Sequence, residues 1–330
     1  MTHGFHKEHF KVAAGVDVDS SCRFAFEANN AAKFVQGDVS KMSSEDIAKL
    51  FSKDDIRVLV GCAPCQPFSL YTNRESPDDK WKLLRFFADF VDGVQPEIVS
   101  IENVPRLTRH RVFKDFVRRL ERRGYFVSHF LARGQDYGIP QRRTRLVLFA
   151  SLYGQVKLIP ATHSKSRTVR ETIGRLEAIP AGGVCKRDAL HRSRGLSEVN
   201  LRRIRATPAG GSWMDWDKEL RLACHRRKTG ETFRSVYGRM SWDEPAPVMT
   251  TQFVGLGNGR FGHPDQDRAI SLREAALFQT FPKEYQFIDP DLTRVSMQSI
   301  ARQIGNAVPV RLGRIIARSI RRHLNDWDVE

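Results

Sequence analysis

The sequence predicts an α/β protein with a doubly wound, mainly parallel sheet and a smaller irregular domain. Over the first 151 residues, short aliphatic segments alternate with amphipathic segments, as in β-α-β units. This alternation stops between residues 152 and 260, where Arg, Gly, Ser, Thr and Pro become frequent. We therefore expect a first domain over residues 1–151, a second over residues 152–260, and a C-terminal segment, residues 261–330, that returns to the first domain.

The spacing of apolar residues and of capping residues predicts the individual elements. Strands are expected at residues 10–17, 34–36, 58–60, 97–101, 125–133 and 145–151. Helices are expected at about residues 20–29, 43–51, 81–91, 112–123, 168–178, 271–279 and 310–323. The glycine-rich run at residues 255–259 lacks the strand-to-helix context of a nucleotide-binding loop, so we interpret it as a turn.

Composition excludes several classes of protein. The 330 residues are 41% hydrophobic and 28% charged, which is typical of a globular enzyme. The sequence shows no apolar run of the roughly 18 residues that a membrane span requires, and no apolar signal core at its start. Its five cysteines are irregularly spaced, which favours a reducing cytoplasm over a secreted disulfide framework.

The positive charge is concentrated in the middle of the chain. Residues 1–105 contain 12 basic and 16 acidic residues, and residues 106–260 contain 32 basic and 13 acidic residues. The middle segment therefore carries a net charge of +19, against +16 for the whole chain. A solvated basic face is one explanation, but this asymmetry favours a polyanionic partner, with nucleic acid as the first candidate.

Cys65 lies in a loop that follows the expected strand at residues 58–60. Ligands of open α/β sheets bind at the carboxyl ends of strands, so this cysteine is placed as a nucleophile would be. The alternatives are a redox pair with Cys62, half of a zinc site, or a buried structural cysteine. A zinc site needs two more ligands, and Cys185 and Cys224 lie far from any paired Cys or His. We predict no metal site.

Two acidic residues follow expected strands. Asp17 ends the first strand, where a carboxylate can accept hydrogen bonds from both ribose hydroxyls of a nucleoside. Asp38 follows the second strand, where it can accept from an adenine amino group. Each is equally well explained as a helix cap or a turn residue.

Aromatic and basic residues are interleaved in the middle segment, a pattern that suits groove binding and phosphate contacts. The aromatic residues are Trp213, Trp216, Phe233 and Tyr237, and the basic ones are Arg202, Arg203, Arg205, Arg221, Arg226, Arg227, Lys228 and Arg234. The alternative is a small aromatic core under a solvated surface.

Five motifs occur in the order found in one enzyme family. They are Gly61–Ser69 with Pro-Cys-Gln at its centre, Glu102-Asn103-Val104, Gln141-Arg142-Arg143-Thr144-Arg145, Arg273–Pro282, and Gln303–Pro309. Together they span nearly the whole chain. The sequence thereby resembles the cytosine-5 DNA methyltransferases of the compact bacterial type.

The resemblance implies a reaction in which Cys65 adds to C6 of a cytosine flipped out of duplex DNA. Glu102 would bind N3 and the amino group of the base, and Arg143 and Arg145 would complete the catalytic set. Asn103 would fix its loop. The loop at residues 70–80 would close over the flipped base.

The same resemblance implies S-adenosylmethionine as cofactor and duplex DNA as partner, read by the variable segment at residues 152–240 as target recognition domain. The cofactor would be held by Asp17, Val18, Asp38, Val39, Pro64, Asn306 and Ala307. The DNA would be contacted by Pro64, Gln66, Ser69, Asn103 and Gln141. We expect a monomer that is located in the bacterial cytoplasm and associated with the nucleoid. A cognate restriction endonuclease, if one exists, would act as a separate protein.

The sequence departs from the family pattern at its start. Family members carry a first strand and a Phe-x-Gly-x-Gly loop before the strand that ends at Asp17, whereas this sequence opens with Met1-Thr2-His3-Gly4-Phe5. We expect the reading frame to begin further upstream. The rival functions are a truncated, catalytically impaired DNA-binding homologue and an RNA cytosine-5 methyltransferase. A dinucleotide-dependent reductase is disfavoured, because no glycine fingerprint follows the first strand.

Overall fold

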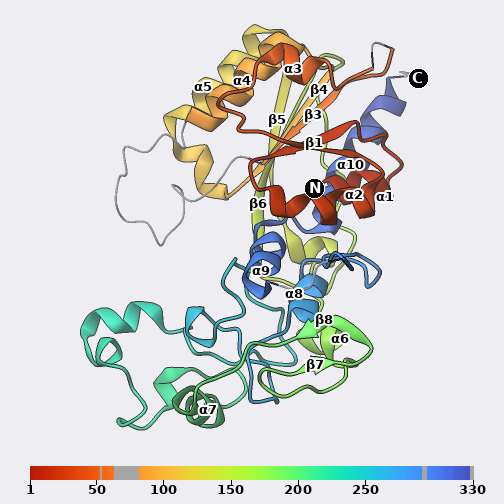
Figure 1. The fold of residues 1–330 in the computed structure, drawn as a ribbon. Helices are drawn as coiled ribbons and strands as arrows, with labels where there is room; N and C mark the ends of the chain where they lie inside the picture. Colours follow the sequence, from red (N-terminus) through yellow and green to blue (C-terminus); the bar gives the residue numbers. More distant parts are fainter. Residues whose placement is uncertain (53, 63–81, 292–295, 328–330) are drawn as a thin grey trace. The chain divides into compact units, whose positions relative to one another are not determined.

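The computed structural model describes residues 1–52, 54–62, 82–291 and 296–327, which form two compact units (Figure 1). Unit 1 comprises residues 1–133, 144–161 and 312–330. Unit 2 comprises residues 134–143 and 162–311. The chain thus returns to unit 1 at Leu312. The roles expected for residues 1–151, 152–260 and 261–330, as catalytic domain, target recognition domain and returning segment, stay predictions.

Unit 1 contains the strands of the expected sheet. They are β1 (Ala14–Asp17), β2 (Lys33–Gln36), β3 (Val58–Gly61), β4 (Ile98–Asn103), β5 (Phe126–Arg133) and β6 (Thr144–Ser151). β1 and β2 form one parallel pair, and the other four strands form a second sheet in the order β3-β4-β6-β5. The α/β class is confirmed, with a mixed sheet. β3 and β4 are parallel, but β6 runs antiparallel to β4 and β5, because only ten residues connect β5 to β6 and leave no room for a crossover helix.

Helices cover this sheet. They are α1 (Thr2–Lys7), α2 (Arg23–Asn30), α3 (Ser44–Ala48), α4 (Lys82–Val94), α5 (Arg111–Arg122) and most of α10 (Val310–Asp326). β4 is buried along its whole length, and its aliphatic side chains pack with α4 and α5. A second cluster around Ile47, Phe90 and Val94 is shared by Val16 of β1 and Leu59 of β3. The two sheets of unit 1 therefore lie over one cluster, although no hydrogen-bonded pairing joins β1 to β3 within the described residues.

The N-terminal segment differs from the expected strand at residues 10–17. The chain turns sharply after α1, where His9 has a φ of 61° and the amide of Phe10 donates to the carbonyl oxygen of Phe5. The strand therefore begins only at Ala14. α1 itself packs closely against α10, since a Cβ on Gly4 would lie 2.5 Å from the amide nitrogen of Arg314.

Unit 2 has little regular structure. Its helices are α6 (Val169–Ile173), α7 (Glu198–Arg205), α8 (Leu272–Phe278) and α9 (Met297–Asn306), and its strands are β7 (Val184–Cys185) and β8 (Asp188–Arg192). The predicted capped helix at 271–279 is confirmed, with Ser271 as its cap. α7 and α9 were not predicted; α7 buries little apolar surface, with Ile204 as its buried apolar side chain, whereas α9 buries Ile300, Ala301 and Ile304. The run at 255–259 contains a short 3-10 turn, in keeping with the predicted turn.

Candidate active site

The residues at the carboxyl ends of β3 and β4 lie next to one another. Gly61 of β3 pairs with Ile101 of the parallel strand β4. Cys62 and Glu102, each the next residue along, therefore leave the same edge of the sheet side by side. Cys62 is exposed, whereas Glu102 is 6% exposed and Asn103 is 2% exposed. The chain enters the predicted nucleophile loop at this edge.

Glu102 forms a nearly buried ion pair with Arg145. The guanidinium Nε of Arg145 lies 3.1 Å from Oε1 of Glu102, and both side chains are largely buried. The pairing of the strands explains this contact, because Glu102 lies opposite Val147 and Arg145 is two residues away on the same face of β6. Arg145 also donates from Nη1 to the carbonyl oxygen of Thr144 at 2.8 Å. A carboxylate thus faces this edge with its position fixed by an arginine.

Two further groups border this edge. Oδ1 of Asn103 accepts a hydrogen bond from the amide of Val104 at 2.8 Å, which holds the turn after β4. The α-amino group of Met1 is buried close enough to Cys62 and Glu102 to feel their charges. Burial lowers the pKa of this amine, while Cys62 and Glu102 act in the opposite direction. The contact of Asn103 is with the residue that follows it, and its role in the loop stays a prediction.

The two acidic residues predicted for cofactor binding lie at the carboxyl ends of β1 and β2. Oδ1 of Asp17 accepts from the amide of Asp19 at 2.8 Å. Oδ1 of Asp38 accepts from the amide and the hydroxyl of Ser40, and these bonds lower the pKa of Asp38. Both carboxylates thus make the local turn contacts that the alternative interpretation expected. Each carboxylate has a second oxygen, and such acceptors fit the hydroxyl and amino groups of a nucleoside.

The two valines beside these carboxylates differ in exposure. Val18 is 68% exposed, so it is available to an apolar surface such as an adenine ring. Val39 instead packs against the cluster around Ile47, Phe90 and Val94. Val39 therefore contributes to the core of unit 1, whatever it contacts in addition.

Gln141 is fully buried in unit 2. Its amide nitrogen Nε2 donates to the carbonyl oxygen of Phe278 and to Oε1 of Gln279, and its Oε1 accepts from the amide of Met249. A side chain with three internal partners and 0% exposure is held in place by the fold. This geometry favours a structural role for Gln141 over the predicted contact with DNA. Arg143, two residues on, is 6% exposed in the same unit.

Gln279 connects α8 to the end of α9. Its Nε2 donates to the carbonyl oxygens of Ile304 and Ala307 at 2.7 and 2.9 Å. Asn306, which is exposed, is the last residue of α9. Gly305 lies against the backbone of Thr250, since a Cβ there would be 2.4 Å from that carbonyl oxygen. These contacts explain the glycine and the glutamine of the last two motifs as packing requirements.

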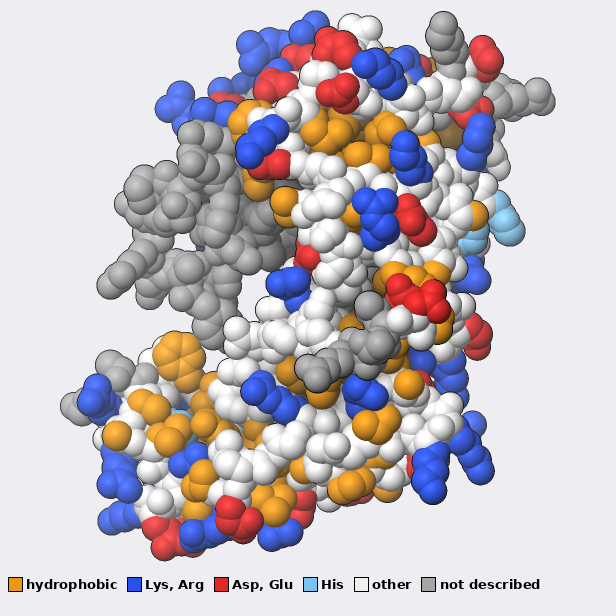
Figure 2. Space-filling view, viewed as in Figure 1, with side chains coloured by type: hydrophobic (Ala, Val, Ile, Leu, Met, Phe, Trp, Pro, Cys, Tyr) orange, Lys and Arg blue, Asp and Glu red, His pale blue; other side chains and the backbone are white. Residues whose placement is uncertain are grey.

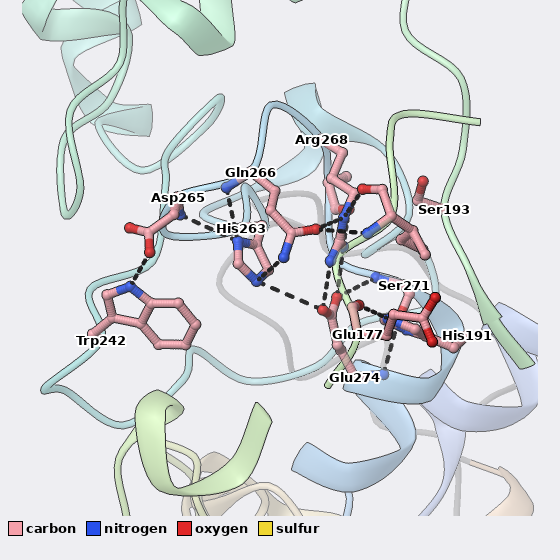
Figure 3. Close-up of polar contacts among 12 residues, drawn as sticks. Glu177, His191, Ser193, Trp242, His263, Asp265, Gln266, Arg268, Ser271 and Glu274 are labelled. Carbon is pink, nitrogen blue, oxygen red and sulfur yellow. Dashed lines mark hydrogen bonds and ion pairs between the residues drawn. The ribbon is translucent and has the colours of Figure 1, made fainter. Parts of the chain in front are cut away.

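A buried polar network surrounds the start of α8 (Figure 3). The carboxylate of Glu274 accepts two hydrogen bonds from Arg268, at 2.8 and 2.7 Å, and one from the amide of Ser271. Ser271 Oγ contacts Nδ1 of His191. Burial lowers the pKa of His263, which lies 3.7 Å from Glu274, to about 4. The sequence predicted α8 and its cap but not this network, in which Arg268 and His263 come from the segment just before α8 and His191 comes from a distant one.

Two of the four aromatic residues predicted to suit DNA binding form a core instead. Trp213 and Trp216 are 3% and 2% exposed and pack with Leu220. Tyr237 is half-buried against them. The alternative of a small aromatic core is therefore right for the two tryptophans. Phe233, in contrast, is 48% exposed.

Several predicted site residues lie outside the described residues. These are Pro64, Cys65, Gln66 and Ser69, together with the predicted closing loop at residues 70–80. In the part of the chain that the structure describes, no group of three or more His, Cys, Asp or Glu side chains is arranged to hold a metal ion. The described helices also include none with the length and apolar character to cross a membrane.

Comparisons with known proteins identify the family. The family described as C-5 cytosine-specific DNA methylase matches residues 1–322. The type II methylase M.HgiDII of Herpetosiphon aurantiacus is 49% identical over 98% of this chain and 92% of its own length. The type II methyltransferase M1.BsuMI of Bacillus subtilis is 32% identical over 77% of this chain and 58% of its own length.

Solved structures show the same fold. An Escherichia coli prophage protein described as a DNA modification methyltransferase has a TM-score of 0.74 at 20% identity, over 98% of this chain and 96% of its own. The Entamoeba histolytica methyltransferase EhMeth has a TM-score of 0.65 at 16% identity, over 96% and 90%. Since the family match and the 49% identical relative both span nearly all of these residues, the chain belongs to the C-5 cytosine-specific DNA methylase family and is a DNA methyltransferase.

Proposed function

We propose that the chain transfers a methyl group from S-adenosylmethionine to C5 of cytosine within a specific duplex DNA sequence, through a covalent bond between Cys65 and C6 of a flipped base. The observation that carries this proposal is the ion pair of Glu102 with Arg145 at the edge where Cys62 leads into the Cys65 loop. A fixed carboxylate beside Cys62, three residues before Cys65 in the sequence, suits addition of a thiolate to an aromatic base.

The chemistry explains why these residue types occur together. C5 of cytosine is a poor nucleophile until the thiolate of Cys65 adds to C6. The carboxyl group of Glu102 would hold N3 and the amino group of the base and favour protonation at N3 as the thiolate adds. Arg145 would keep that carboxyl group in position and offset its charge. After C5 has gained the methyl group, a base such as water takes the C5 proton, and the bond between Cys65 and C6 breaks to release the thiolate.

The cofactor residues are part of the proposal. S-adenosylmethionine, when bound, supplies an electrophilic methyl group. Asp17 and Asp38 would accept hydrogen bonds from its ribose and adenine, and exposed Val18 would cover the adenine ring. Val39, Pro64, Asn306 and Ala307 would complete the site. The donor set fits a nucleoside, because two carboxylates and an exposed apolar side chain lie at the ends of paired parallel strands.

We further propose that unit 2 reads the DNA site and that Pro64, Gln66, Ser69, Asn103 and Arg143 contribute to binding of the DNA or its flipped base. The net charge of +19 over residues 106–260 supports a polyanionic substrate. Two relatives are type II methylases, and we propose that the chain likewise acts separately from any restriction endonuclease, as a monomer in the bacterial cytoplasm.

Methyl transfer to duplex DNA tests the proposal directly. The protein is incubated with S-adenosylmethionine carrying a labelled methyl group and with duplex DNA, and the DNA is digested to nucleosides. We expect 5-methylcytosine from the wild-type chain and none from Cys65→Ser. Duplex DNA containing 5-fluorocytosine should remain covalently attached to the wild-type chain alone, since the fluorine cannot leave as a proton does.

Competition separates the rival functions. An RNA methyltransferase would label transfer RNA in preference to duplex DNA. A catalytically impaired homologue would bind duplex DNA but trap no 5-fluorocytosine. Either result would refute the proposed reaction.

A further inference from the structure

Two exposed apolar side chains are held together on the surface of unit 2. Met214 and Phe233 are 43% and 48% exposed. They belong to two short 3-10 turns, Trp213–Asp215 and Lys228–Phe233, which are separated by residues 216–227. The indole nitrogen of Trp213 donates to the carbonyl oxygen of Phe233 at 3.0 Å, so the two turns are fixed side by side.

A stacked aromatic core supports these turns from below. The rings of Trp213 and His225 lie 4.3 Å apart at an angle of 17°, and the Arg221 guanidinium lies over the Trp213 ring. Arg221 also donates to the carbonyl oxygens of Met214 and Trp216. The exposed side chains therefore project from a well-packed core. Little conformational entropy is then lost when they bind a partner.

Two arginines lie in the segment that leads from the aromatic core to the turn ending at Phe233. Arg226 and Arg227 are exposed, and neither forms an ion pair within the described residues, although Arg226 donates to the carbonyl oxygen of Lys218. Guanidinium groups without a carboxylate partner suit contacts with phosphates, and the exposed apolar side chains of the adjoining turns suit contacts with bases. On the face drawn in Figure 2, unit 2 likewise presents basic side chains with hydrophobic ones exposed among them.

We propose that Met214, Arg226, Arg227 and Phe233 form a DNA-reading patch, in which Phe233 contacts bases and the two arginines contact phosphates. This inference rests on the proposed function and extends it to named residues. Phe233 is the base-contacting group because its ring offers a flat apolar face for a thymine methyl group or for a wedge between base steps. Trp213 and Trp216 do not contact the DNA themselves; they act only by supporting the two turns from below.

Affinity measurements with the entire chain test the two roles separately. The probe is a pool of short random-sequence duplexes, followed by the sequence that the wild-type chain enriches from that pool. We expect Phe233→Ala to weaken binding of the enriched sequence by about 5- to 100-fold without changing its salt dependence. The double variant R226Q/R227Q should reduce the slope of log K against log salt concentration by about 1.8, because each lost phosphate contact contributes about 0.9.

Matched controls come from the same chain. Phe126 is 53% exposed on β5 in unit 1, so Phe126→Ala removes an equally exposed ring outside the patch and should leave affinity unchanged. Arg202 is paired with Glu219 at 2.8 Å, so Arg202→Gln should change the salt slope by less than half as much as the double variant.

Crosslinking tests whether Phe233 contacts DNA even if Phe233→Ala folds poorly. Replacing Phe233 with p-azidophenylalanine keeps the ring, and light should join it to the enriched duplex, whereas the same replacement at Phe126 should not. Wild-type affinity and site choice in Phe233→Ala, or no crosslink at position 233, would overturn the patch while methyl transfer stood. A crosslink at position 233 in a chain that transfers no methyl group would uphold the patch and refute the proposed reaction.

Discussion

Replacing Arg268 alone should destabilise unit 2 far more than replacing both Arg268 and its ion-pair partner Glu274. Arg268 and Glu274 are 0% and 1% exposed and share two hydrogen bonds. Burial would raise the pKa of Glu274, but the bonds and the charge of Arg268 outweigh it and hold the pKa below its usual value. Arg268→Met leaves a buried carboxylate without its cation, at a cost of about 3–5 kcal/mol. For a unit of this size that corresponds to a fall in Tm of roughly 6–20 °C.

The double variant distinguishes this reasoning from simple loss of contacts. R268M/E274Q leaves no buried charge at this pair, and the side-chain carbonyl introduced at position 274 can still accept from the amide of Ser271. The double variant should therefore be more stable than Arg268→Met alone. Thermal unfolding of the wild-type chain, both single variants and the double variant gives the coupling free energy. A double variant that is less stable than Arg268→Met would contradict the account of the pair.

Three other perturbations follow from the same structure. His263 has a folded pKa of about 4 against an ordinary 6.5, so its neutral form is favoured in the fold. About 3 kcal/mol of stability should be lost as the pH falls from 6.5 to 4, and His263→Gln should reduce this loss in unfolding curves. Gly305→Ala should cost about 1–3 kcal/mol because its Cβ would meet a backbone carbonyl, whereas Gly195→Ala, which meets nothing within 4 Å, should not lower Tm comparably. Arg145→Gln should reduce kcat about 10²–10³-fold with a smaller change in KM. Arg145→Lys should recover part of the lost kcat, because it restores a cation beside Glu102. A change confined to KM would point to a binding role for Arg145 instead.

Local signals in the sequence predicted much of unit 1. Aliphatic runs located β2, β3, β4 and β6 to within a few residues, and β4 and β6 are the ones buried along most of their length, as such a run predicts. The acids at Asp17 and Asp38 were placed at strand ends for the same reason. The early start expected for β1 was wrong, since the turn at His9 depends on contacts with α1 that periodicity does not show.

Long-range contacts explain what the sequence did not predict. The tryptophans at 213 and 216 look like binding residues among so many arginines, yet they form the core of an irregular unit. Gln141 resembles a polar site residue, but its partners lie more than 100 residues away, at Met249, Phe278 and Gln279. Burial of a polar side chain depends on which distant carbonyls and amides surround it, and no local pattern encodes that.

The separation of β1–β2 from β3–β4 has a consequence for the behaviour of the chain in solution. Within the described residues, β1 and β3 each carry a strand partner on one side only, while Val16 and Leu59 pack against the same cluster. The outer backbone amides of such edges exchange hydrogen readily and offer a template for pairing with another extended segment. A strand that paired with both edges would join the two sheets and close the core between them. Within the described residues, these two edges are therefore places where another chain can pair with unit 1, as are the outer edges of β2 and β5.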